Sequence, residues 1–304
     1  MSRIVITGGA GRLGRSLVAG LTARDHEIVS FDLAVSNASE LEGVAQIAID
    51  LTDATATADA LAASHADALI HLAAIAVPFS APEDVILRVN SGLAVSVMGG
   101  AVRAGIRRIV AASSPTVLGY GADGWVPDRF PLDERTPPKP SNAYALSKLV
   151  IEQSISMLHR QTGDNVRYAA FRPCYVIAPE EWEGAPTQQG HTVQERLDDP
   201  ALSAPALFNY VDARDVAGFA DTLLAALPHT PNAETYFVGA DDALARQPLA
   251  DLVPQFFPGT EDVAAVLAGT SPAFSNAKAA ELLGWHPTYG WRDQLQTARK
   301  EQPA

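Results

Sequence analysis

The chain has 304 residues, 47% of them apolar and 19% charged, which is the balance of a globular protein able to bury a full core. Its formal net charge of −13, with no basic run longer than Arg107–Arg108, disfavours nucleic-acid binding. The single cysteine, Cys174, excludes an intrachain disulfide and fits a reducing compartment. The first apolar run begins almost at Met1 and the longest, 68–79, is short for a membrane span, so we expect a cytoplasmic protein without a secretory signal or membrane association.

Short apolar runs alternate with longer helical patterns through the first half of the chain. The predicted strands are 3–7, 27–32, 46–49, 67–73, 107–113 and 166–172. The predicted helices between them are about 12–23, 54–63, 84–104 and 142–161. The strands are near-continuous apolar runs rather than alternating ones, as expected when helices cover both faces of a sheet. The pattern therefore predicts an α/β fold with a doubly wound parallel sheet.

The pattern changes after Pro173. Residues 174–205 are irregular, a helix is expected within 210–227, a strand at 234–239, and a short helix ending at Gly284. We therefore predict a dinucleotide-type domain of residues 1–172 plus about 206–240. Residues 173–205 and 241–304 are predicted to form a smaller, discontinuous C-terminal lobe that binds the substrate.

Three glycines, Gly8, Gly11 and Gly14, stand where the first strand turns into the first helix. In that context the first glycine permits a tight turn, the second lets a pyrophosphate approach the main chain, and the third lets the helix pack closely on the sheet. The N–H groups at the helix start then face an anion. Asp32, at the end of the second strand, lies where an acid bonds the ribose hydroxyls of the adenosine.

An acid at position 32 repels a 2′-phosphate, so NAD is favoured over NADP. Arg12 and Arg15 leave that choice open, because a nearby cation neutralises the extra phosphate. Asp50 and Leu51 follow the third strand, where a carboxylate and an apolar side chain can flank an adenine. Taken alone, Asp50 is better interpreted as an ordinary loop carboxylate than as a cofactor contact.

A second pattern concerns proton chemistry. Tyr144 and Lys148 are four residues apart on a predicted helix and share one face. A lysine ammonium beside a phenol favours the phenolate, so we expect the pKa of Tyr144 to be lowered towards neutrality, as a general acid/base requires. Ser113 and Ser114 end the fifth strand at the edge where doubly wound sheets bind ligands.

The sequence resembles the extended short-chain dehydrogenase/reductases, also called the NAD-dependent epimerase/dehydratase family. The resemblance runs over nearly the whole chain. Its segments are "TGGAGRLG", "DL" at 50–51, "HLAA" at 71–74, "VNSG", "SSPTVLG", "YALSK", "FRPCYVIAP", "YVDARDVA" and "AKAAELLGWHP".

The resemblance implies a Rossmann domain and a catalytic triad of Ser114, Tyr144 and Lys148, with Ser114 chosen over Ser113 because it directly precedes "PTVLG". In that family the tyrosine exchanges a proton with the substrate, the serine bonds the same oxygen, and the lysine binds the nicotinamide ribose. The predicted cofactor-binding residues are Gly8, Gly11, Arg12, Leu13, Gly14, Asp32, Asp50, Leu51, Leu72, Ala73, Ala74, Asn90, Tyr144, Lys148 and Pro173. For Asn90 a purely structural role at a helix start is an equal alternative. No metal ion is predicted.

Two reaction classes compete. A nucleotide-sugar epimerase or dehydratase needs cations for two phosphates. The family's usual arginine ahead of "YVDARDVA" is absent, and residues 174–290 contain only Arg196, Arg214, Arg246 and Lys278 as basic side chains. We therefore favour a dehydrogenase or reductase acting on a small non-nucleotide compound such as a sugar or sugar acid, since several segments are similar to those of uronate dehydrogenases.

The predicted substrate contacts are Ser114, Pro115, Thr116, Arg129 and Tyr175, with Arg129 the partner for a carboxylate. The resemblance also implies a homodimer. A non-catalytic NAD-sensing regulator is the remote alternative, because such proteins tend to lose the Tyr or the Lys.

Overall fold

In the computed structural model, the backbone is described for residues 1–301 and the side chains for residues 1–297. The chain divides into two compact units. The first unit holds Met1–Val117, Pro138–Arg172 and Ala217–Tyr236, and the second holds Leu118–Pro137, Pro173–Val216 and the chain from Phe237 onward. Relative to the boundaries expected from the sequence, segments 118–137, 206–216 and 237–240 group with the second unit.

A seven-stranded sheet in the order β3-β2-β1-β4-β5-β6-β9 forms the framework of the first unit. Its strands are β1 Arg3–Thr7, β2 Glu27–Asp32, β3 Ala45–Ala48, β4 Ala68–His71, β5 Arg108–Ala112, β6 Arg167–Pro173 and β9 Glu234–Val238. The pairs from β3 through β6 are parallel. The chain moves outward from β1 to β3 and then starts again at β4 on the other side of β1. The carboxyl ends of β1 and β4 therefore flank the switch point at which such sheets bind ligands.

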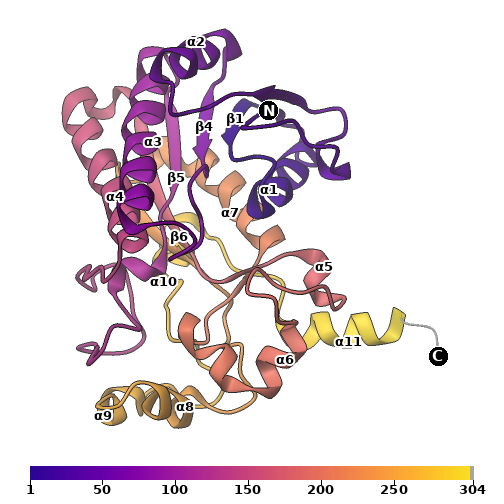
Figure 1. The fold of residues 1–304 in the computed structure, drawn as a ribbon, viewed down its shortest axis with the longest axis vertical. Helices are drawn as coiled ribbons and strands as arrows, with labels where there is room; N and C mark the ends of the chain where they lie inside the picture. Colours follow the sequence, from indigo (N-terminus) through magenta and orange to yellow (C-terminus); the bar gives the residue numbers. More distant parts are fainter. Residues whose placement is uncertain (302–304) are drawn as a thin grey trace. The chain divides into compact units, whose positions relative to one another are not determined.

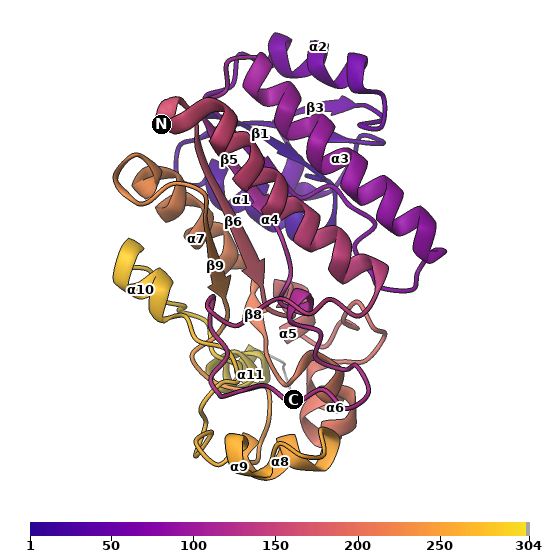
Figure 2. The same cartoon turned by 90° about the vertical axis from the view of Figure 1, so that its left-hand side faces the viewer.

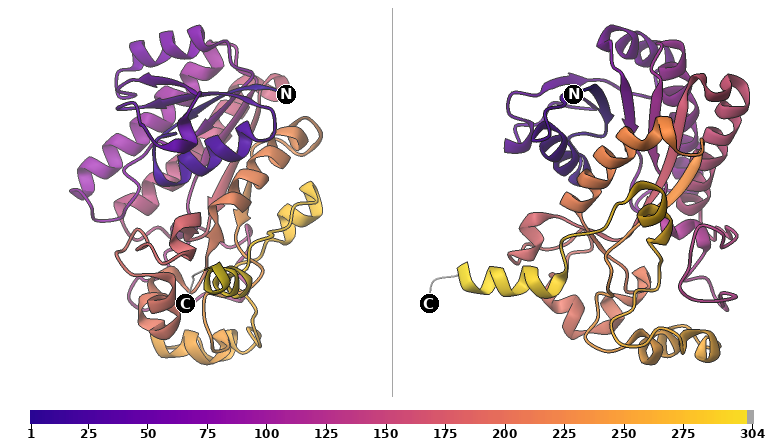
Figure 3. Two further views of the ribbon diagram at one scale, coloured as in Figure 1. Left: turned by 90° about the vertical axis from the view of Figure 1, so that its right-hand side faces the viewer. Right: turned by 180° about the vertical axis from the view of Figure 1, so that it is seen from behind.

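Helices cover both faces of this sheet. The helices are α1 Arg12–Thr22, α2 Ala54–Ser64, α3 Glu83–Arg103, α4 Ala143–Thr162 and α7 Ala213–Ala226. Helices α2, α3 and α4 share one face, seen from that side in Figure 2, and their apolar side chains form a core with the strands around Leu61, Val97 and Ile151. Helices α1 (indigo) and α7 (orange) lie on the other face (Figure 3, left), where His26 Nε2 is 2.9 Å from the Asp221 carboxylate.

Helix α3 has the length and apolar composition of a membrane-spanning helix, with a mean hydropathy of 1.5 over its most apolar window. It is the one helix within the described residues that meets both conditions, and 44% of that window is buried inside the protein. Helix α3 lies beside α2 and α4 (Figure 1), and its buried part packs against these two helices and against strand β4.

The expected elements are confirmed with small shifts at their ends. Strands β1 and β2 match their predicted ranges, and the helices predicted at 54–63 and 142–161 run over Ala54–Ser64 and Ala143–Thr162. The parallel, doubly wound architecture is also confirmed. Gly284 ends the last predicted helix with a left-handed φ of 66°.

The second unit is built from short elements. They are β7 Val176–Ile177, α5 Pro179–Trp182, α6 Val193–Asp198, β8 Val211–Asp212, α8 Leu249–Phe256, α9 Glu261–Ala264, α10 Ala277–Leu283 and α11 Trp291–Glu301. A separate apolar cluster joins β7, α5, α6 and α11, with Trp182 and Tyr210 packed edge to face and Trp291 buried beside them. Because the segments here are short and Pro- and Gly-rich, periodicity alone predicts few of them.

Gly14 tests the close packing of α1 on the glycine loop. A Cβ at this position would lie 2.0 Å from the carbonyl oxygen of Gly8. We expect Gly14→Ala to lower the free energy of unfolding by about 1–3 kcal/mol, since the backbone must shift. Gly92→Ala is the control, because its Cβ meets nothing within 4 Å and its exposed position in α3 favours alanine by up to about 1 kcal/mol. Urea denaturation measures both, and equal effects of the two substitutions would contradict this account.

Candidate functional site

The glycine loop joins β1 to α1 at the carboxyl edge of the sheet. Gly8 has a φ of +73°, and a Cβ there would lie 2.9 Å from the backbone nitrogen of Ala73, so only glycine fits. Gly11 is the N-cap of α1 and has no side chain that could cap this helix. Its first turn, which begins with Arg12 and Leu13, contains no acidic residue. The N-terminal N–H groups of α1 lie at the positive end of the helix dipole, where an anion is favourable.

Asp32 links the end of β2 to this loop. One carboxylate oxygen accepts a hydrogen bond of 3.0 Å from the backbone N–H of Ala10, and the other accepts one of 2.8 Å from that of Leu33. The carboxylate is half-buried and held in one orientation beside the glycines. The position of Asp32 at the end of β2 is as predicted, and its contact with ribose hydroxyls stays a prediction.

Asp50 stays a loop carboxylate in this structure. It accepts hydrogen bonds from the backbone N–H of Thr52 at 2.9 Å and from its hydroxyl at 2.7 Å, and both hold the pKa of Asp50 below its ordinary value. Its side chain is exposed, while Leu51 is buried. These two hydrogen bonds stabilise the turn at Asp50–Thr52, which gives Asp50 a structural role without any adenine.

A hydrogen-bonded cluster fixes the end of β4 against β1. His71 Nδ1 is 2.7 Å from the Thr7 hydroxyl, which also accepts from the N–H groups of Leu72 and Ala73. Burial, together with the positive charge of Lys148, lowers the pKa of His71 to about 3. The imidazole is therefore neutral at pH 7 and cannot exchange protons there. The half-buried residues Leu72 to Ala74 follow at the switch point.

Asn90 is buried in α3 and its amide group is used within the protein. Its oxygen accepts from the N–H of Ile75 at 2.8 Å, and its nitrogen donates to the Ile75 carbonyl at 3.2 Å and to the Ser147 hydroxyl at 3.0 Å. The helix-start role considered from the sequence is wrong, because Asn90 lies inside α3 and not at its start, and its amide instead makes these buried contacts with Ile75 and Ser147. Asn90 fastens the loop after β4 to helix α4, one residue before Lys148.

Ser114 and Tyr144 meet through their hydroxyl groups. Ser114 follows the end of β5. The Thr116 hydroxyl donates a hydrogen bond of 2.9 Å to the Ser114 hydroxyl. Pro115 opens the short 3₁₀ turn that carries Thr116. Burial raises the pKa of Tyr144 to about 12, and its hydrogen bond with Ser114 acts in the opposite direction. The expected lowering of the Tyr144 pKa by Lys148 is wrong for this structure, because burial dominates.

Lys148 is almost completely buried on the face of α4 that carries Tyr144. Its ammonium donates to the Ala112 carbonyl at 2.9 Å and lies 5.6 Å from the centre of the Tyr144 ring. Burial lowers the pKa of Lys148 to about 8. The lysine is therefore still mainly charged at pH 7, but it loses its charge at a pH more than two units below the ordinary lysine pKa of 10.5.

Two acidic residues that sequence reasoning missed hold α4 in place. Glu83, at the start of α3, accepts a hydrogen bond of 2.6 Å from the N–H of Ala143, which adds to the Asn142 cap of the same helix end. Glu152, one turn after Lys148, accepts from the Ser113 hydroxyl at 2.6 Å. The spacing of Glu152 from Lys148 was a usable signal, since residues four apart share a helix face. Nothing in the sequence near Glu83 pointed to a helix 60 residues later.

The remaining predicted residues belong to the second unit. Pro173 is the first residue of the segment Pro173–Val216, and Tyr175 carries the Arg196 guanidinium 4.1 Å above its ring. Arg129 donates to both carboxylate oxygens of Asp133 at 2.9 and 2.8 Å. Although burial acts to raise it, hydrogen bonds from Arg135 and Arg129 keep the pKa of Asp133 below its ordinary value. Arg129 is thus engaged in a surface ion pair, half-exposed rather than directed into a pocket.

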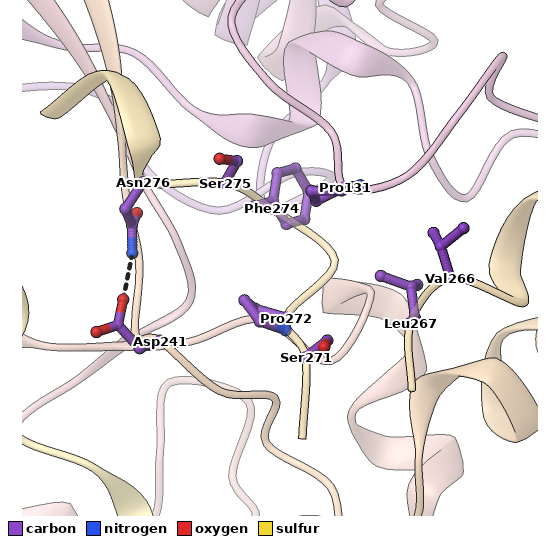
Figure 4. Close-up of a pocket in the computed structure, with 9 residues that line it drawn as sticks. All are labelled: Pro131, Asp241, Val266, Leu267, Ser271, Pro272, Phe274, Ser275 and Asn276. Carbon is purple, nitrogen blue, oxygen red and sulfur yellow. Dashed lines mark hydrogen bonds between the residues drawn. The ribbon is translucent and has the colours of Figure 1, made fainter. Parts of the chain in front are cut away.

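Figure 4 shows a shallow cavity of about 340 Å³ in the second unit. Its walls contain Phe274 and Pro131, and the Asn276 amide faces the Asp241 carboxylate at 3.5 Å. None of the residues predicted as substrate contacts lines it. Within the described side chains, no group of three or more His, Cys, Asp and Glu residues is arranged to hold a metal ion.

Curated relatives of this chain include both epimerases and dehydrogenases. The L-arabinose 1-dehydrogenase (NAD(P)+) of Haloferax volcanii is 33% identical over 49% of this chain and 58% of its own length. The UDP-glucose 4-epimerase of Bacillus subtilis is 32% identical over 53% of this chain and 49% of its own. The sterol demethylase protein B of Methylococcus capsulatus is 28% identical over 70% and 62%. The chain matches about half to three fifths of the length of these relatives.

Solved structures resemble the fold over nearly the whole chain at lower identity. A short-chain dehydrogenase/reductase superfamily protein from Agrobacterium tumefaciens with bound NAD is 22% identical, has a TM-score of 0.71, and is matched over 98% of this chain and 97% of its own. A UDP-glucose-4-epimerase from Stenotrophomonas maltophilia is 20% identical, has a TM-score of 0.70, and is matched over 99% and 98%.

The model of the "NAD dependent epimerase/dehydratase family" matches residues 4–239, a span that contains the glycine loop, Asp32, Ser114, Tyr144 and Lys148. The resemblance inferred from the sequence is therefore confirmed, and the chain belongs to the NAD-dependent epimerase/dehydratase family.

Proposed function

We propose that the protein is an NAD-dependent oxidoreductase that acts on a hydroxyl or carbonyl carbon of a small non-nucleotide substrate, such as a sugar or sugar acid. The observation that carries the proposal is the grouping at the carboxyl edge of the sheet, where Tyr144 is hydrogen-bonded to Ser114 and Lys148 lies one turn further along α4. A cytoplasmic location and a homodimer remain proposals from the sequence.

The glycine loop fits a dinucleotide. The N-cap of α1 is a glycine without a capping side chain, the first turn holds no acid, and Gly8 brings the bare loop against Ala73. A pyrophosphate placed here would lie at the favourable end of the helix dipole. Asp32 would hold the ribose hydroxyls, and its charge would oppose a 2′-phosphate. These features support NAD as the preferred cofactor.

NAD, when bound, would supply the acceptor or donor of the hydride. The protein's own groups handle the proton. With a pKa of about 12, Tyr144 is neutral at pH 7 and its hydroxyl can donate to a substrate carbonyl oxygen. Ser114, itself held by Thr116, can donate a second hydrogen bond to that oxygen. In the oxidative direction, the hydrogen bond with Ser114, which acts to lower the pKa of Tyr144, would favour its phenolate form.

An epimerase acting on a nucleotide sugar is the second candidate, because epimerases are among the relatives. Of the four basic residues in 174–290 that could bind a diphosphate, two are held in ion pairs and Arg196 lies over the ring of Tyr175. Arg214 pairs with Asp212 at 2.6 Å and Arg246 pairs with Asp198 at 2.9 Å. We therefore place the non-nucleotide dehydrogenase first.

The primary test is an absorbance assay for NADH with NAD and a panel of neutral sugars, sugar acids and small alcohols. We expect turnover with one class, and a loss of about 10²–10⁴-fold in kcat for Tyr144→Phe, because the proton donor is removed. Cofactor affinity should stay within about threefold, since the ring remains.

The epimerase proposal would replace this one if no substrate is turned over, NAD co-purifies with the protein and UDP-sugars bind to it. A Tyr144→Phe variant that turns over like wild type would remove Tyr144 from the chemistry.

Lys148 should destabilise the fold at neutral pH. Because its pKa is about 8 in the folded protein and 10.5 ordinarily, the unfolded chain binds more protons between those values, and stability rises with pH there. We expect Lys148→Met to raise the free energy of unfolding at pH 7 by about 1–3 kcal/mol, after allowing for the lost bond to Ala112. The gain should vanish near pH 10.

Urea denaturation at pH 7 and pH 10 measures this effect, with Lys139→Met, an exposed lysine, as the matched control. A Lys148→Met variant with the same stability difference at both pH values would show that burial does not disfavour the charged lysine.

Asp32 should set the choice between NAD and NADP. We expect Asp32→Asn, which keeps an acceptor for Ala10 but removes the charge, to lower the preference for NAD by at least about tenfold in kcat/KM. Asp53→Asn, which changes a carboxylate that caps α2, is the control and should leave the ratio unchanged. An unaltered ratio in Asp32→Asn would remove Asp32 from cofactor selection.

A further inference from the structure

A buried ion pair lies behind the Tyr144 and Lys148 face of α4 and takes no direct part in the chemistry proposed above. Arg172, near the end of β6, donates from Nε to one oxygen of Glu152 at 2.8 Å and from a terminal nitrogen to the other oxygen at 2.8 Å. Both side chains are more than nine-tenths buried. Two parallel hydrogen bonds fix the relative orientation of the two groups as well as their distance.

Ser113 joins this pair from the neighbouring strand. Its hydroxyl donates to Glu152 at 2.6 Å, and its backbone N–H donates to the Phe171 carbonyl at 2.7 Å, which continues the pairing of β5 with β6 by one residue. The carboxylate of Glu152 therefore receives donors from the ends of two adjacent strands. The sequence offered Ser113 as an alternative to Ser114, and the structure gives it this separate contact.

Lys148 and Glu152 stand one turn apart on α4 and bond to two consecutive residues, the last residue of β5 and the one that follows it. The Lys148 ammonium contacts the Ala112 carbonyl, and the Glu152 carboxylate contacts the Ser113 hydroxyl. A slip of α4 by one residue would move each side chain by about 1.5 Å along the axis and about 100° around it. Both contacts would break together, so the pair defines one register of α4 on the sheet.

We propose that Glu152, with Ser113 and Arg172, forms a positioning network that holds Tyr144 and Lys148 in register with Ser114. Ser114 is the next residue after Ser113, and its hydroxyl is the one that meets Tyr144. The consequence for turnover rests on the proposed function, whereas the positioning of Lys148 does not.

The energetics of buried ion pairs support a role in orientation. Replacing such a pair by apolar side chains of similar volume is often neutral or stabilising, because desolvation offsets the attraction. Apolar packing is non-directional and tolerates small slips that hydrogen bonds of 2.6–2.8 Å do not. A displacement of about 1 Å at a catalytic group is enough to cost about 10²-fold in rate.

The first test is Ser113→Ala, which removes one hydroxyl and leaves the ion pair. We expect kcat to fall by about 10–100-fold with KM and NADH affinity within about threefold. Ser64→Ala is the matched control, since Ser64 is equally buried and donates to the Leu61 carbonyl far from α4. The control should lose comparable thermal stability and keep its kcat. A kcat within twofold of wild type in Ser113→Ala, or an equal loss in both variants, would overturn the proposal.

A second readout does not depend on turnover. The chain contains four lysines, so ¹³Cε-lysine NMR resolves each titration, and Lys148→Arg identifies the signal of interest. The Lys148 ammonium should titrate near 8 in wild type, and in Ser113→Ala its pKa should rise towards 10.5 as water reaches it. An unchanged pKa would contradict the positioning role even in an active enzyme. A shifted pKa in a protein that turns over none of the substrates would support the network while the proposed function fails.

The double variant Glu152→Met/Arg172→Met separates orientation from stability. We expect a Tm at or above that of wild type together with a kcat lowered at least tenfold, because the apolar pair packs without fixing the register. A double variant that is folded and fully active would overturn the proposal.

Discussion

The buried ammonium of Lys148 is the constraint on which the arrangement of the site depends. A lysine inside a fold is costly unless its charge finds an acceptor. The open carbonyl of Ala112, the last residue of β5, supplies that acceptor at 2.9 Å. Helix α4 must therefore cross the sheet where β5 ends. One turn earlier on the same face, Tyr144 then comes to the hydroxyl of Ser114, and one turn later Glu152 comes to that of Ser113.

The charge of Lys148 also affects the protonation of His71 on the neighbouring strand. Burial and Lys148 keep His71 neutral, so the ends of β4 and β5 hold one positive charge instead of two. The N-terminal end of the α1 dipole adds a partial positive charge at this edge. The edge thus presents the Lys148 ammonium and this helix end together with the Asp32 carboxylate, in a protein of net charge −13. Salt screens the interaction between exposed charges beyond about 8–10 Å. The binding of a small anion therefore depends on the nearby charges, whereas the binding of a long polyanion depends on the net charge of the protein. This is why the composition argues against nucleic acid yet is compatible with a dinucleotide.

The sequence predicted those parts of the molecule that depend on neighbours along the chain. The strand ends, the glycine loop and the Tyr144–Lys148 face follow from local periodicity and turn chemistry, which are visible in short windows. The contact of Glu83 with Ala143 and the pair of Arg172 with Glu152 join residues 60 and 20 positions apart, and no local pattern encodes them. The prediction of a lowered pKa for Tyr144 was wrong for a related reason. The effect of a neighbouring lysine can be read from spacing, but the depth of burial, which dominates here, is a property of the packed fold.

The second unit was the least predictable part, and its charges bear on the choice of substrate. Asp212 is fully buried, and Arg214 neutralises it with two hydrogen bonds while lying 3.8 Å over the ring of Tyr289. If a diphosphate drew Arg214 away, Asp212 would remain as an uncompensated buried charge, at a cost of about 3–5 kcal/mol. A charge-assisted bond from arginine to phosphate contributes about 1.5–3 kcal/mol, so the exchange is unfavourable. A neutral polyol or a single carboxylate requires no such exchange. The internal pairing of its cations therefore favours a small substrate without a nucleotide, on physical grounds that are independent of any relative's specificity.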